Sequence, residues 1–160
     1  MLTPTECLAG PVSMASAMTL IMPRTSHEHL ALIVESEGKK HLVALGERYL
    51  FASFECETND DWTGLHIRGV SIELDETALF DNDGYYPPVG SMVRSDDNLS
   101  VHVSARRGGS ARDTLLPILT GLPKCGARSS VCFLRWQIVV GEGDAKRVLQ
   151  VVDVRSKQPV

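Results

Sequence analysis

The chain has 160 residues and a mass of 17.5 kDa, and its hydrophobic fraction of 43% is that of a folded protein rather than a disordered one. Sixteen basic and 20 acidic residues give a net charge of −4, which argues against a generic nucleic-acid binder, because such proteins are usually basic. The length fits a single globular domain over residues 1–160, and no run of about 18 apolar residues predicts a membrane span.

The first 23 residues are predicted to be a helical segment. Thr3-Pro4-Thr5-Glu6 has the form of a capping box with proline in the first turn, and Gly10-Pro11 would end that short helix. A second helix starting at Ser13 would gather apolar side chains on one stripe before Pro23 ends it. We expect this stripe, which includes Met14, Met18 and Met22, to pack on a sheet or on a second subunit.

Residues 28–155 are predicted to form a β-rich core, because the hydrophobic period changes to two near residue 29. Alternation marks strands at residues 29–35, 41–45, 49–57, 65–74, 92–95, 99–105, 132–140 and 146–155. Turn residues around Gly38 and Asn98 predict two hairpins. A change of phase near Gly69 predicts a β-bulge, and bulges bend strands toward curled sheets.

Two further features complete the predicted fold. Residues 115–119 fit a short helical turn that Gly121 would stop, with Pro117 near its start. The strand at 146–155 is apolar on both faces, so we expect it to lie centrally in the sheet. The prediction is a mainly β (α+β) fold with a mostly antiparallel, curled or barrel-like sheet of about eight strands, an N-terminal helix and one short helical turn.

The charge is unevenly distributed along the chain. Residues 47–97 carry twelve acids and three bases, a balance of −9, and residues 106–135 carry six bases and one acid, a balance of +5. Such polarity can steer a charged partner toward one side of the protein. Alternatively, the two stretches face each other within the fold or across a dimer.

A basic glycine-containing loop is the most suggestive candidate site. Its residues are Arg106, Arg107, Gly108, Gly109, Ser110 and Arg112. Glycines let backbone N–H groups approach an anion, and arginines can fork onto phosphate or carboxylate. The loop lacks the spacing and the lysine of a phosphate-binding P-loop, so the alternative is a solvated loop paired with the acidic stretch.

A second candidate is a partner surface made of aromatic residues in predicted loops. Trp62, Tyr85 and Tyr86 are the aromatic side chains that we expect to be exposed, and Pro87-Pro88 follows directly. Tyrosine and tryptophan are favoured anchors of protein interfaces. The alternative is that they cap an open end of the sheet.

Metal and nucleophile patterns are weak. His27-Glu28-His29 with His41 could approach a metal, but such histidines in a strand are usually polar surface. Asp81-Asn82-Asp83-Gly84 fails the spacing of a calcium loop and is interpreted as a turn.

Catalytic patterns are weak too, because Cys56, which could lie near His66, lacks an activating motif. The carboxylates Glu55, Glu57, Asp60 and Asp61 could include a general acid–base pair but are better explained by solubility. We expect no metal and no cofactor.

The cysteines and the N-terminus predict a location. Cys7, Cys56, Cys125 and Cys132 show no C-x-x-C spacing, so we read them as reduced structural thiols that suit a reducing cytoplasm. Ala15-Ser16-Ala17 mimics a signal-peptide cleavage site, but residues 1–23 contain no lysine or arginine to precede it. The prediction is a cytoplasmic protein.

Two functions are compatible with these features. The first is a non-enzymatic binding or accessory protein that acts through a protein partner, as a homodimer. The alternative is a small-molecule binder or small enzyme whose curled sheet encloses a pocket, with an anionic ligand near residues 106–112. We expect no nucleic-acid or membrane partner. A deep pocket lined by those arginines would favour the alternative, and a filled core with an exposed apolar patch would favour the first.

Overall fold

The computed structural model describes most of the chain and confirms a β-rich fold. The described residues are 7–11, 18–23, 30–45, 51–55, 63–80, 87–95, 97–107, 110–120, 122 and 130–155. Within them lie fourteen strands, which are β1 (Cys7–Pro11), β2 (Leu20–Pro23), β3 (Ala31–Ser36), β4 (Lys39–Ala44), β5 (Ala52–Glu55), β6 (Thr63–Ile67), β7 (Val70–Leu74), β8 (Leu79–Phe80), β9 (Met92–Ser95), β10 (Asn98–Arg107), β11 (Ser110–Leu119), β12 (Ser130–Phe133), β13 (Arg135–Val140) and β14 (Arg147–Asp153). A single 3-10 turn at Gly143–Ala145 is the only helix in this described part.

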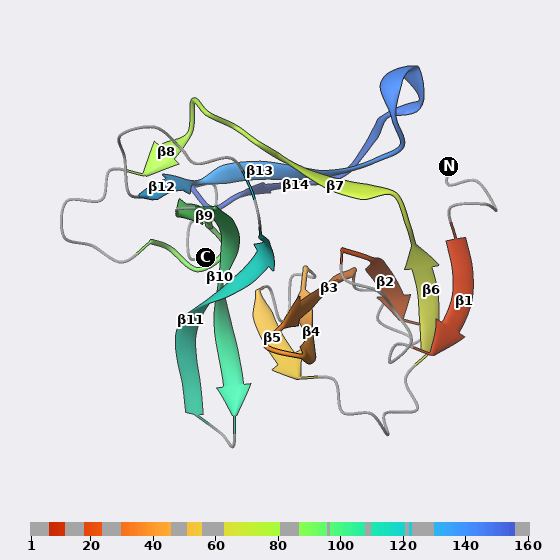
Figure 1. Ribbon diagram of the computed structural model, residues 1–160, viewed down its shortest axis with the longest axis horizontal. Coiled ribbons are helices and arrows are strands. Elements are labelled where there is room, and N and C mark those ends of the chain that lie inside the picture. Colours follow the sequence, from red (N-terminus) through yellow and green to blue (C-terminus); the bar gives the residue numbers. More distant parts are fainter. Residues whose placement is uncertain are drawn as a thin grey trace.

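The strands form two sheets. The large sheet has the order β1-β6-β2-β3-β4-β5-β10-β9-β12-β8, and β11 pairs with the other edge of β10. The small sheet has the order β14-β13-β7 and runs across the top of the molecule in Figure 1. All described strand pairs are antiparallel except β10 with β5. The β10–β11 hairpin projects away from the small sheet (Figure 1).

One hydrophobic cluster joins the two sheets. Leu20, Leu32 and Val101 of the large sheet share it with Trp136 and Ile138 of the small sheet. Burying these side chains supplies the main stabilisation, at about 25 cal/mol for each Å² of apolar surface removed from water. A second, smaller cluster around Ile33 and Leu42 lies on the opposite face of the β2–β5 region, because neighbours along a strand point to opposite faces.

Hairpins with clear turn residues were predicted correctly. β3 and β4 pair from Ala31 with Ala44 to Ser36 with Lys39, and the two residues between them, Glu37 and Gly38, both have positive φ. Two consecutive positive φ values are what a tight two-residue hairpin requires. β9 and β10 form the second predicted hairpin.

The prediction of helices in the first 23 residues is wrong where the structure describes them. Cys7–Pro11 and Leu20–Pro23 are strands, and both pair with β6. Met18 has a φ of 59°, which a right-handed helix does not permit. Leu20 and Ile21 are both fully buried on opposite faces of the sheet, which a single helical stripe could not achieve. Ser13 and Met14 lie outside the described residues.

The predicted helical turn at 115–119 is also wrong. These residues belong to β11, where Pro117 lies opposite Ser100 next to a shift in register. Proline cannot donate to a ladder, and such irregular positions are where strands tolerate it.

Two predicted strands each divide between the sheets, and β1, β2, β8 and β11 were not predicted as strands, so fourteen strands replace about eight. The bulge expected near Gly69 is a break instead: Gly69 has a φ of +70°, and the chain passes from β6 in the large sheet to β7 in the small one. The predicted strand at 132–140 breaks at Leu134, with β12 in the large sheet and β13 in the small one. These two passages hold the sheets together covalently.

Gly90 anchors the core where the sheets meet. Its φ is +97°, and it lies in a turn that the Ser91 N–H closes by donating to the Pro88 carbonyl over 3.1 Å. The Gly90 carbonyl accepts a hydrogen bond of 2.8 Å from the indole N–H of Trp136. The ring of Phe51 occupies the space that a Cβ at Gly90 would need. Phe51 and Trp136 are themselves neighbours, with ring centroids 6.3 Å apart.

Candidate functional site

The outer face of the small sheet is the candidate site. Cross-strand register places three rows of residues on the face that points away from the shared core. These rows are Asp75, Arg135 and Asp153; Glu73, Gln137 and Val151; and Ser71, Val139 and Val148. The first two rows carry charged and polar groups apart from Val151, which lies next to Val139 and Val148 of the last row; Ser71 is the polar member of that row. The face therefore has a polar end and an apolar corner.

A β-bulge in β14 creates the apolar corner. Ile138 pairs with Gln150 but Val139 pairs with Val148, so Leu149 is an extra residue without a partner of its own. This shift brings Val148 and Val151 to the same face, although they are three residues apart. Val148 is 51% exposed and Val151 is 47% exposed. Leu149 packs against the core instead.

The position of β14 corrects a prediction. The strand is apolar on both faces but lies at the edge of the small sheet, not at its centre. The bulge explains this pattern, because it turns Val148 outward to join Val151, while Val152 stays buried beside Trp136. Val148 and Val151 are two of the four large apolar side chains that are exposed among the described residues.

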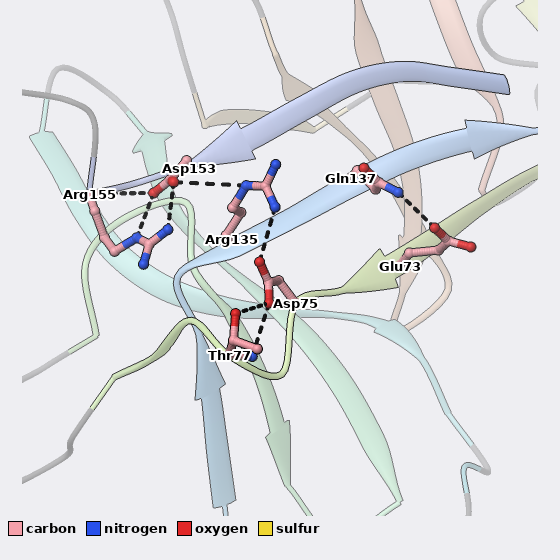
Figure 2. Close-up of polar contacts among 7 residues, drawn as sticks. All are labelled: Glu73, Asp75, Thr77, Arg135, Gln137, Asp153 and Arg155. Atoms are coloured by element: carbon pink, nitrogen blue, oxygen red, sulfur yellow. Dashed lines mark hydrogen bonds and ion pairs between the residues drawn. The ribbon is translucent and has the colours of Figure 1, made fainter.

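Ion pairs organise the polar end, as Figure 2 shows. Arg135 bonds to Asp75 over 3.0 Å and lies 3.9 Å from Asp153. Arg155 binds Asp153 through two guanidinium hydrogen bonds of 2.8 and 2.9 Å. The Thr77 hydroxyl and backbone N–H donate to Asp75 over 2.6 and 2.9 Å. The contact between Asp75 and Arg135 joins the acidic and basic stretches of the sequence within the fold.

Hydrogen bonds shift the charged groups toward their ionised forms. The Thr77 hydroxyl, then its backbone N–H, then Arg135 lower the pKa of Asp75 to about 2. The side-chain bonds from Arg155 lower the pKa of Asp153, and the same contact raises the pKa of Arg155. These groups therefore stay charged and paired across the physiological pH range.

A second polar link crosses the middle strand. The Gln137 amide donates to Glu73 over 2.7 Å, and Lys146 forms an ion pair with the same carboxylate. Lys146 precedes β14 and Glu73 belongs to β7, so their contact must pass over the outer face of β13. This position accounts for the full burial of Val139 on that face.

An open groove of about 400 Å³ lies along the polar end. It is lined by Glu73, Leu74, Asp75, Glu76, Arg135, Trp136 and Gln137. Its polar groups are largely engaged with one another, and it is not the enclosed apolar pocket typical of small-molecule sites.

The Asp75 cluster makes a prediction about pH. Because the carboxyl pKa is depressed from about 3.9 in an unfolded chain, Asp75 stabilises the fold above about pH 4, and this contribution is lost as the pH falls toward 2. We expect Asp75→Asn to lower the free energy of unfolding at pH 7 and to flatten its dependence on pH between 4 and 2. Urea unfolding at a series of pH values measures both effects.

The control for this prediction is Glu142→Gln, which changes an exposed carboxylate in the β13–β14 connection. This variant is expected to follow the wild-type pH profile. An Asp75→Asn profile parallel to that of the wild type would contradict the assignment. Some slope should remain in Asp75→Asn, because Asp153 titrates in the same direction.

The predicted basic loop is the tip of the β10–β11 hairpin. Arg106 and Arg107 end β10, Ser110 begins β11, and Gly108 and Gly109 lie outside the described residues. Arg112 pairs with Ala105, and Arg107 pairs with Ser110.

Most other predicted site residues lie outside the described part of the chain. These are Trp62, Tyr85, Tyr86, His27, Glu28, His29, Cys56, Glu57, Asp60, Asp61, and Asp81 to Gly84. Glu55 of β5 forms an ion pair with Lys39 over 3.0 Å and lies opposite His41 in the register of β4 with β5. His41 lies in β4 and His66 in β6.

The described residues include no group of three or more histidine, cysteine or acidic side chains that could hold a metal ion. Cys132 is a buried free thiol, and burial raises its pKa, as expected for a structural cysteine. No helix in the described ranges is long and apolar enough to cross a membrane.

Comparison with known proteins identifies one family. Residues 9–159 match the model of a family described as "Uncharacterised protein y4lG". The chain is 36% identical over 149 residues to the "Uncharacterized protein y4lG" of Sinorhizobium fredii (strain NBRC 101917 / NGR234). The aligned region covers 93% of this chain and 91% of that relative. No solved structure matches the chain significantly. The matched region includes every residue of the outer face of the small sheet.

Proposed function

The chain belongs to the family of the uncharacterised protein y4lG, and we propose that it is a non-enzymatic binding or accessory protein that acts through protein–protein contacts as a homodimer. The observation that carries this proposal is the pair of exposed valines, Val148 and Val151, on an edge strand. Apolar side chains that are exposed side by side on a sheet face favour an interaction surface. The outer face of the small sheet is the contact surface.

The rest of the site supports binding rather than catalysis. The charged groups of the groove beside the valines, Asp75, Arg135 and Glu73, already bond to groups of the same face. They therefore leave few polar atoms free to bind a ligand. A general acid or base needs a pKa near the working pH, whereas the pKa values of Asp75 and Asp153 are lowered. The paired charged groups are suited to stabilise the conformation of the face, while Val148 and Val151 contact the partner.

Double substitution of the valines tests the proposal. We expect Val148→Asp with Val151→Asp to raise the dimer dissociation constant at least about tenfold, since two carboxylates would be buried in an apolar contact. Size-exclusion chromatography with light scattering over a range of concentrations measures the molar mass. The wild type is expected to approach twice 17.5 kDa, and the variant to remain near 17.5 kDa.

The chain offers a matched control. Leu79 on β8 and Leu115 on β11 are 43% and 46% exposed, but they lie in the large sheet. Leu79→Asp with Leu115→Asp should leave the dimer unchanged. Equal weakening by both double variants would refute the small sheet as the contact surface, and a wild type that is monomeric at all concentrations would refute the homodimer.

Binding of a small anion at the β10–β11 hairpin is the second candidate function. The observation that favours it is the backbone register of β10 with β11, which brings Arg106, Arg107 and Arg112 to the same end of one hairpin, and arginines can fork onto an anion. We expect Arg107→Ala with Arg112→Ala to abolish thermal stabilisation by inorganic phosphate or nucleotides. The absence of stabilisation of the wild type by any anion would exclude this candidate.

A further inference from the structure

We propose that the outer part of the β10–β11 hairpin is a basic arm that binds the phosphate backbone of double-helical DNA. The basic arm consists of residues 105–107 and 110–112, which include Arg106, Arg107 and Arg112 and no acid. This inference uses the hairpin of the second candidate function and goes beyond it, because the ligand is a row of phosphates rather than one small anion.

The basic arm extends past the strands that flank β10. β9 pairs with β10 as far as Val101, and β5 pairs with it as far as Ala105. Beyond that point, the described partner of Arg106 and Arg107 is β11. The arm is therefore a two-stranded ribbon, and it lies at the end of the molecule opposite the small sheet (Figure 1). Small-molecule sites are concave, whereas a projecting ribbon is suited to enter a groove of a larger partner.

The basic arm carries a charge of opposite sign to the rest of the chain. Its three arginines give +3, and since the whole chain carries −4, the remainder carries −7. The net charge argues against a generic nucleic-acid binder, but the fold places the positive charge of the arm at one end. Acids of the remainder have bases of their own, as in the pairs of Asp75 with Arg135 and Glu55 with Lys39.

The composition of the basic arm favours DNA over a protein or a membrane as the partner. The segment 105–112 contains only alanine, arginine, glycine and serine, so it offers no aromatic or large aliphatic side chain. Protein interfaces are usually anchored by aromatic side chains, and membrane-binding segments insert apolar ones. Arginine forks onto phosphate oxygens, and the major groove of B-form DNA admits a two-stranded β-ribbon.

The acidic remainder confines the contact to the arm, and this sets its dependence on salt. Each phosphate that a base neutralises contributes about −0.9 to the slope of log affinity against log salt concentration. Three arginines therefore predict a slope between about −2 and −3 for one bound arm. The affinity should fall about 15- to 60-fold between roughly 50 and 200 mM sodium chloride.

Fluorescence anisotropy tests this inference with the full chain. The probe is a labelled DNA duplex of about 12 base pairs, roughly one helical turn, which leaves room for one arm. Arg106→Ala, Arg107→Ala and Arg112→Ala should each weaken binding and bring the slope closer to zero by about 1. Arg68→Ala is the matched control, because Arg68 is exposed between β6 and β7 and its loss changes the net charge equally. This control should keep the slope of the wild type.

The outcomes separate this inference from the second candidate function. The predicted slope, reduced by the three arm variants and not by Arg68→Ala, supports the basic arm. Equal effects of the arm variants and Arg68→Ala overturn it. Poly-glutamate that competes as well as unlabelled duplex at equal charge overturns the assignment to DNA. A wild type that does not bind the duplex at the lowest salt concentration, yet is stabilised by inorganic phosphate, overturns the inference and leaves the second candidate function intact.

Discussion

Gly90→Ala is expected to lower the free energy of unfolding by about 2–5 kcal/mol, a large share of the roughly 5–15 kcal/mol typical of a folded domain. At a φ of +97° a side chain costs about 1–2 kcal/mol. The new Cβ would also overlap the ring of Phe51, and forcing atoms into a filled core costs a further 1–3 kcal/mol or so. Urea denaturation followed by fluorescence measures the change.

Two companion variants separate these costs. Gly38 has a φ of +74° but no atom within 4 Å of the place where a Cβ would lie, so Gly38→Ala should cost only the conformational part. Phe51→Leu combined with Gly90→Ala should recover part of the loss, because the smaller side chain makes room. If Gly90→Ala cost no more than Gly38→Ala, the close contact between Gly90 and Phe51 would be disproved.

Trp136→Phe is expected to lower the free energy of unfolding by about 2–4 kcal/mol. The side chain of Trp136 is 1% exposed, and its indole N–H donates to the Gly90 carbonyl. Phenylalanine removes that donor and leaves the carbonyl without its partner, which costs about 1–3 kcal/mol. The smaller ring also leaves a cavity between the two sheets.

Phe133→Leu is the control for the loss of volume. Phe133 is buried in the same cluster as Trp136, and the substitution removes part of a ring, for an expected cost of about 1–2 kcal/mol. The Trp136→Phe variant should be the more destabilised of the two in the same denaturation assay. Equal costs would show that the hydrogen bond to Gly90 contributes nothing to stability.

Local signals in the sequence predicted those parts of the fold in which the paired strands are close together along the chain. The hairpin at Glu37-Gly38 and the β9–β10 hairpin depend on turn residues that lie between their own strands. The N-terminal segment was misjudged for the opposite reason. β1 pairs Leu8 with His66, and a contact between residues so far apart in sequence outweighs a helical pattern that spans a few turns.

The candidate site was harder to predict than the fold. Asp75 and Arg135 are separated by 60 residues, and the acidic and basic stretches indicated mutual attraction without identifying a pair. The sequence predicted an apolar strand at residues 146–155, but it did not show that this strand lies at the edge of the small sheet. One extra residue at Leu149 decides which side chains face outward, and no alternation pattern reveals that residue before the partner strand is known.

The most direct test of the proposed contact is amide hydrogen exchange of the wild-type chain at low and high protein concentration. Self-association through the small sheet predicts that peptides containing residues 147–153 exchange more slowly at high concentration, while peptides from β8 and from the β10–β11 hairpin do not change. Exchange in residues 147–153 that is independent of concentration, in samples where light scattering detects a dimer, would contradict the assignment of this face as the interface.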